Sequence, residues 1–168
     1  MSPVAAYAAE ACRLYILVVL GAALLGKARA VDALRDTVVS LSGLGDRGAA
    51  VAARAVIGVE AATLVAVIVE PAAGMVGAMV LFALFWAVIL FALVRRPAVV
   101  CNCFGGGARP ISRLDLVRNL AMTGACAFFL LSPRPPALAP SGWLLLLGVG
   151  IIAFLISTHL DEIIAPAR

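Results

Sequence analysis

The chain has 168 residues, of which 64% are hydrophobic and only 13% are charged. Soluble globular domains carry roughly 25% charged residues, so this composition excludes an ordinary soluble domain and predicts one membrane-embedded domain over residues 1–168. The net charge of +4 comes mainly from arginine, and basic and aromatic residues are not interleaved as in nucleic-acid-binding proteins. We therefore expect the lipid bilayer, and no nucleic acid, as a partner.

Five apolar segments have roughly the 20-residue length that a helix needs to cross a bilayer. The predicted transmembrane helices cover residues 11–26, 49–69, 73–94, 115–131 and 143–158. Residues 28–30 resemble a signal-peptide cleavage site, but no basic cluster precedes the first segment, so we interpret it as a retained span. The expected fold class is all-α, a polytopic helix bundle of about five spans, or four spans and a re-entrant or interfacial piece.

Residues 31–44, between the first two spans, have apolar side chains at helical spacing. The intervening positions carry charges, so a short amphipathic helix lying in the membrane interface is predicted. A plain polar connector is the alternative. The apolar positions are Val31, Leu34, Val38 and Leu41, and the charged ones are Asp32, Arg35 and Asp36.

Particular residues mark where the later spans begin and end. Pro71 cannot continue a helix and biases Glu70 out of helical geometry, which separates the second span from the third. Ser112 and Asp115 have the spacing of a capping box, which predicts that the fourth helix begins there. Trp143 is expected to anchor the start of the fifth span at the membrane interface.

The distribution of cations predicts the orientation. The segments 27–54 and 95–118 each contain five Lys or Arg residues, and in a five-span protein they share one side with Arg168. The opposite side has only Arg13 and Arg134. Because cytoplasmic loops are rich in Lys and Arg, we expect a multi-pass protein of the cell membrane with its N-terminus outside and its C-terminus and segment 95–118 cytoplasmic.

Cys101 and Cys103, separated by one residue, are the leading candidates for chemistry. Nearby cations favour the reactive thiolate, and Arg109 and Arg113 are close in sequence. A disulfide across one residue closes a strained ring, and strained disulfides are easily reduced and tend to be catalytic or regulatory. We predict that the pair cycles between dithiol and disulfide, as in a thiol–disulfide oxidoreductase. His159, on the same predicted side, is either a proton donor to a thiolate, a ligand or an interfacial residue.

Three alternatives to thiol exchange stay open. The pair could bind a soft metal such as Cu(I) or Hg(II). The chain could be a non-catalytic small subunit of a larger membrane complex, or the two thiols could be loop cysteines without a role. A structural zinc site is not expected, because it needs four ligands and usually a wider cysteine spacing.

Glu60 lies near the middle of the second predicted span. A carboxyl at membrane depth normally faces the bundle interior, and function is the default hypothesis. We expect it to be protonated or paired, with Thr63 on the same face. It would relay protons, bind a quinone-like carrier or make a structural hydrogen bond between helices; the sequence requires no cofactor. Cys12 and Cys126 are either a second thiol pair or two buried structural cysteines.

Four short pieces together carry a family resemblance over about two-thirds of the chain. They are Gly26-Lys27, Gly58-Val59-Glu60, Cys101-Asn102-Cys103-Phe104-Gly105 and Arg118-Asn119. With them the chain resembles the methylamine-utilisation MauE family and, more distantly, the DoxX-like membrane proteins. The resemblance implies a role in maturing exported, disulfide-containing proteins with a thioredoxin-like partner. Methylamine dehydrogenase is the substrate in the founding case, but many relatives occur outside that pathway, so methylamine itself is not carried over.

The resemblance and the cation distribution point to different sides of the membrane. Maturation of exported proteins suggests thiols that face outward, whereas the cations place Cys101 and Cys103 inside. Either reducing equivalents pass from this pair to Cys12 and Cys126 on the outer side, or one apolar segment does not span. We favour the side that the cations indicate.

Overall fold

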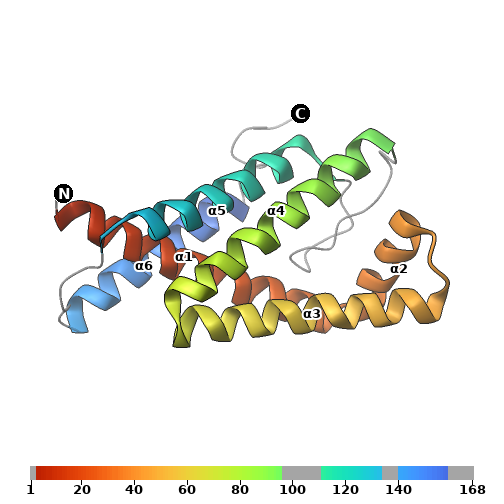
Figure 1. The fold of residues 1–168 in the computed structure, drawn as a ribbon, viewed down its shortest axis with the longest axis horizontal. Coiled ribbons are helices and arrows are strands. Elements are labelled where there is room, and N and C mark those ends of the chain that lie inside the picture. The colour runs from red at the N-terminus through yellow and green to blue at the C-terminus, as the bar shows by residue number, and fades with distance from the viewer. Residues whose placement is uncertain (1–2, 96–110, 134–139, 159–168) are drawn as a thin grey trace.

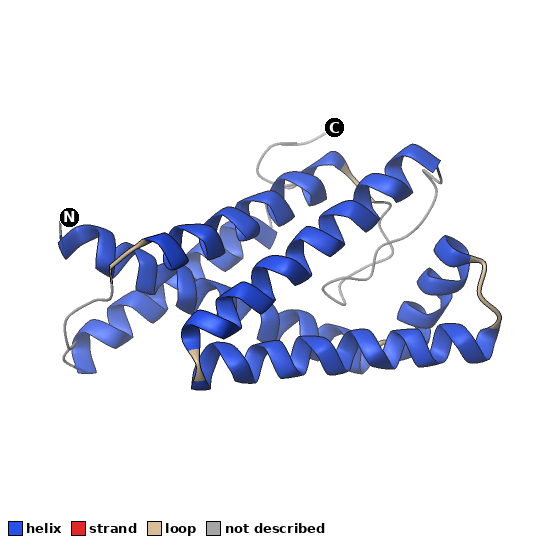
Figure 2. Cartoon of the chain, viewed as in Figure 1, coloured by secondary structure: helices blue, strands red, loops and turns tan. Residues whose placement is uncertain are grey.

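The computed structural model describes residues 3–95, 111–133 and 140–158, and these residues form helices joined by short connections without a strand (Figure 2). The helices are α1 (Pro3–Arg29), α2 (Val31–Ser42), α3 (Asp46–Val69), α4 (Pro71–Arg95), α5 (Arg113–Leu131) and α6 (Pro140–Thr158). All except α2 are long and apolar enough to cross a membrane, so the five predicted spans and the all-α class are confirmed.

The helices begin earlier than the hydropathy pattern predicted. α1 begins at Pro3 rather than at residue 11, and α6 begins at Pro140 rather than at Trp143. In α1 the extra turns contain Glu10, which pairs with Arg13 one turn further along, so that its charge is accommodated within the helix. Proline is favoured in the first turn of a helix, because its missing N–H would have no partner there.

The long helices form one bundle in which successive spans run in opposite directions (Figure 1). α4 packs against α3 and α5, α1 contacts α3, α5 and α6, and α6 lies on the outside of α1. One end of the bundle, here called the α2 end, contains α2, the last turns of α1 and α4 and the first turns of α3 and α5. The opposite end contains the start of α1, the α3–α4 connection, the end of α5 and the start of α6.

The bundle has an apolar core to which four spans contribute. It is formed by buried residues of α1, α3, α4 and α5, which come together because each helix repeats small or apolar side chains every three or four positions. The members are Ile16, Val19, Leu20, Val67, Met75, Ala78, Leu81, Phe82, Met122 and Cys126. The polar residues described below lie on the same inward faces.

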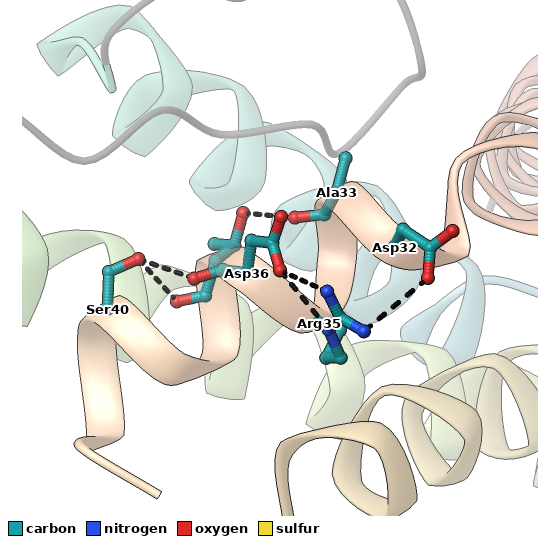
Figure 3. Close-up of polar contacts among 6 residues, drawn as sticks. Asp32, Ala33, Arg35, Asp36 and Ser40 are labelled. Atoms are coloured by element: carbon teal, nitrogen blue, oxygen red, sulfur yellow. Dashed lines mark hydrogen bonds and ion pairs between the residues drawn. The ribbon is translucent and has the colours of Figure 1, made fainter. Parts of the chain in front are cut away.

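The predicted amphipathic segment is the helix α2, which packs against α3 and buries none of its own residues. Figure 3 shows Arg35 between two carboxylates, with its NH2 nitrogen 2.9 Å from Asp36 Oδ1 and its NH1 nitrogen 3.8 Å from Asp32 Oδ1. The helix ends at Gly43, whose φ of 72° is the left-handed conformation that glycine adopts without strain. The helix is thus confirmed, and its location in the membrane interface stays a prediction.

Candidate functional site

A buried ion pair joins α1 to α3 inside the bundle. Lys27 Nζ lies 2.6 Å from Glu60 Oε1, and the two side chains are only 4% and 1% exposed. Glu60 is therefore buried, as its position in the second span predicted, and it is paired. Thr63, one turn further along α3, is also buried, and its hydroxyl donates to the carbonyl of Val59 at 2.8 Å.

Helical spacing places both charges on inward faces. Lys27 follows Ala23 by four residues, and Glu60 precedes Val67 by seven, and both apolar neighbours are buried. Residues at these separations share one face of a helix. A side chain on such a face enters the core whether it is apolar or charged, so each charge needs a partner there.

Sequence reasoning missed Lys27 as the partner of Glu60 and used it only as a cation of a connector and as part of the Gly26-Lys27 piece of the family resemblance. The spacing of Lys27 from Ala23 could have revealed this partner, because residues four apart share one helix face and that face packs in the core. The pair nevertheless connects residues that are 33 positions apart in the chain, and spacing within one helix does not show which two faces meet.

Aromatic and amide groups complete the surroundings of this pair. Lys27 Nζ lies 5.2 Å from the centre of the Phe85 ring of α4, within the range of a cation–π interaction. Beside the pair is a cavity of about 20 Å³. It is lined by Val19, Ala23, Lys27, Glu60, Phe82, Phe85, Asn119 and Met122. This volume is smaller than a quinone ring, and the quinone-binding role, one of three considered for Glu60, stays a prediction.

The two candidate redox cysteines, Cys101 and Cys103, lie outside the described residues, and so do Arg109 and His159. The described residues on either side of this segment are packed together. Their cluster is formed by Ile89, Ala92 and Ile111, with Leu41, Leu93 and Leu116 against it. The end of α4 and the start of α5 are therefore held in contact at the α2 end.

The start of α5 has the capping box that Ser112 and Asp115 predicted. The backbone N–H of Ser112 donates to Asp115 Oδ2 at 2.9 Å, and Asp115 Oδ1 lies 3.2 Å from the NH2 nitrogen of the buried Arg118. Arg113, the first residue of α5, is exposed. Its cation is thus accessible from outside the bundle at the point where α5 begins.

Cys12 and Cys126 lie on two helices that contact each other, α1 and α5. Cys126 is fully buried in the core, Cys12 is partly buried, and both are free thiols. Cys12 is in the first half of α1 and Cys126 in the second half of α5, so both are nearer the end opposite α2. The structure thus brings the two cysteines into one region, and their pairing stays a prediction.

A second cluster of polar and aromatic side chains lies at the end of the bundle opposite α2, and sequence analysis did not identify it. Arg13 Nε donates to Oε1 of the buried Glu10 at 2.5 Å, and Arg13 Nη1 donates to the carbonyl of Val67 at 3.3 Å. The guanidinium of Arg13 also lies 5.6 Å from the centre of the Trp143 ring. The expected interfacial anchor Trp143 therefore also contacts a cation. These side chains line a cavity of about 490 Å³.

Known proteins resemble this chain over most of its length. The family model described as "Methylamine utilisation protein MauE" matches residues 5–132, which include almost all of α1 and the whole of α2 to α5 but not α6. The "Methylamine utilization protein MauE" of Paracoccus denitrificans is 33% identical over 135 residues, which cover 78% of this chain and 72% of that protein. No solved structure matches the chain.

Proposed function

We propose that this chain, which belongs to the methylamine-utilisation MauE family, is a membrane thiol–disulfide exchange protein that acts through Cys101 and Cys103 in the maturation of exported proteins. The family and the five apolar helices make it a multi-pass membrane protein. A thioredoxin-like protein is the proposed partner. The relative from Paracoccus denitrificans is named for methylamine utilization, and we extend a role in that process to this chain. Methylamine itself is not assigned as a ligand.

The observation that carries this proposal is the spacing of the two thiols in a segment between packed helix ends. Ile89 and Ala92 of α4 contact Ile111, just before α5, so the connection that contains both cysteines begins and ends at one end of the bundle. The exposed Arg113 adds a cation there. Such a cation favours the thiolate, which is the attacking species in exchange.

The proposed reaction is a balanced exchange between two dithiol–disulfide couples. One thiolate of the pair attacks a sulfur of the partner's disulfide, forms a mixed disulfide and releases the partner's other sulfur as a thiolate. The second cysteine then attacks the mixed disulfide and displaces the partner's first sulfur. Cys101 and Cys103 are oxidised to a disulfide, the partner is reduced to a dithiol, and the two protons pass to the partner. Reversal of the same steps reduces the pair.

A Cys103→Ser variant is expected to accumulate mixed disulfides with its partner, because the resolving thiol is absent. Alkylation trapping followed by non-reducing electrophoresis would show the adducts, and the wild-type protein would show both a dithiol and a disulfide form. A Cys12→Ser/Cys126→Ser variant is the matched control and should keep both forms. Full maturation activity in a Cys101→Ser/Cys103→Ser variant would refute the exchange proposal, and stoichiometric copper lost on either change would favour metal binding.

The side of the membrane is tested by labelling the pair with a membrane-impermeant maleimide in a Cys12→Ser/Cys126→Ser background. We expect labelling only after the cells are permeabilised, because segments 27–54 and 95–118 carry most of the Lys and Arg residues and cytoplasmic loops are rich in them. Labelling of intact cells would place Cys101 and Cys103 outside and would remove the need for a relay to Cys12 and Cys126.

A further inference from the structure

We propose that the cavity beside the Lys27–Glu60 pair is a binding site for one water molecule, which connects Glu60 of α3 to Asn119 of α5. This inference does not rest on the proposed thiol exchange. It follows from a buried polar atom without a partner, from the size of the cavity beside it and from the polar groups in the cavity wall.

The polar atom is the second carboxylate oxygen of Glu60. Glu60 Oε1 accepts from Lys27 at 2.6 Å, whereas Oε2 is buried and has no hydrogen-bond partner among the described residues. Nearly all buried polar atoms in folded proteins are hydrogen-bonded to protein or to ordered water. An unsatisfied carboxylate oxygen carries a full desolvation cost, so a donor at this position is strongly favoured.

The cavity has the right volume for one water. A bound water needs at least about 10–15 Å³ of accessible space and two to four polar partners. The cavity of about 20 Å³ meets the first condition. Most of its wall is apolar, so a water there would be held by the few polar groups present.

Those polar groups are Lys27, Glu60 and Asn119. The Lys27 ammonium has three N–H donors and gives one to Glu60 Oε1. The Asn119 amide donates to the carbonyl of Asp115 at 3.0 Å, which leaves its other N–H and its oxygen for a further partner. Because Lys27 and Glu60 neutralise each other, the site has no net charge that would retain an ion. A neutral donor and acceptor, water, fits this set.

The bound water would give α5 a polar connection to the ion pair between α1 and α3. Asn119 lies on α5 near its capping box, and α5 follows the segment that contains Cys101 and Cys103. The water would therefore help to fix the register of α5 against the Lys27–Glu60 pair. Asn119 is in this sense a positioning residue.

The first test is a structure of the wild-type protein, in detergent or a nanodisc, at a resolution that shows ordered water. We expect a single peak within hydrogen-bond distance of Glu60 Oε2 and of the Asn119 amide. An empty cavity at that resolution would overturn the proposal. This test uses no variant and is unaffected by changes in folding.

The second test fills the cavity with Ala23→Val in two backgrounds. In the wild-type background the extra methyl groups displace the water and leave Oε2 unsatisfied, so we expect the unfolding temperature to fall by about 2–6 °C. In a Lys27→Met/Glu60→Leu background, where no carboxylate needs water, the same change should leave the unfolding temperature unchanged or raise it. An equal shift in both backgrounds would mean that no water is displaced and would overturn the proposal.

Discussion

Replacing Lys27 with Met is expected to destabilise the bundle by about 3–5 kcal/mol, because it leaves an uncompensated carboxylate in the interior. Glu60 is only 1% exposed, so bulk solvent does not reach the carboxylate that has lost its cationic partner. Glu60→Leu should cost a similar amount, since it leaves the Lys27 ammonium buried. The measurement is the free energy of unfolding in mixed micelles for both single variants and for the double variant Lys27→Met/Glu60→Leu.

The double variant distinguishes a buried ion pair from two independent side chains. Apolar replacement of both partners is often close to neutral, so most of the loss should be recovered. Arg35→Met on α2 is the matched control, because Arg35 is 36% exposed beside Asp32 and Asp36 and a surface pair contributes only about 0–1 kcal/mol. Losses in the two single variants that simply add in the double variant would contradict a coupled pair.

Gly74→Ala is expected to have the second large effect, a loss of about 3 kcal/mol or more. A Cβ at Gly74 would overlap backbone atoms of Ala66 and Val67, and backbone cannot move aside as a flexible side chain can. The hairpin between α3 and α4 would have to open around Pro71. The expected result is a marked fall in the unfolding temperature of the purified protein.

Gly77→Ala, one turn further along α4, provides the control. A Cβ there would lie 3.7 Å from Thr63 Cγ2, which is ordinary van der Waals contact. Because alanine is favoured over glycine inside a helix by roughly 0.5–1 kcal/mol, this variant should be as stable as the wild type or more so. If Gly74→Ala and Gly77→Ala unfold at the same temperature, the close approach at Gly74 does not hold in the folded protein.

These two predictions rest on features that differ in how far the sequence could reveal them. Pro71 and Glu70 marked the α3–α4 boundary, but neither shows how closely the two helices approach at Gly74. Glu60 could be placed in the interior because a carboxyl within an apolar span has few other locations. Its partner could not be named, because the register of α1 against α3 depends on how all the spans pack.

The sequence by itself determined the class of the protein and the course of its spans. Long apolar runs interrupted by Pro71 and by the Ser112–Asp115 capping box form helices from local hydrogen bonds alone, and a membrane leaves such segments no alternative. The same is true of α2, whose amphipathic pattern is local.

Only the tertiary structure decided which polar groups meet. Lys27 with Glu60, Arg13 with Trp143, and Asn119 at the small cavity combine faces of several helices. Those faces are selected by the fit of side chains such as Met75, Phe82 and Met122 in the shared core. Packing is a property of the whole bundle, and the period within one helix shows which side is buried without showing what it is buried against.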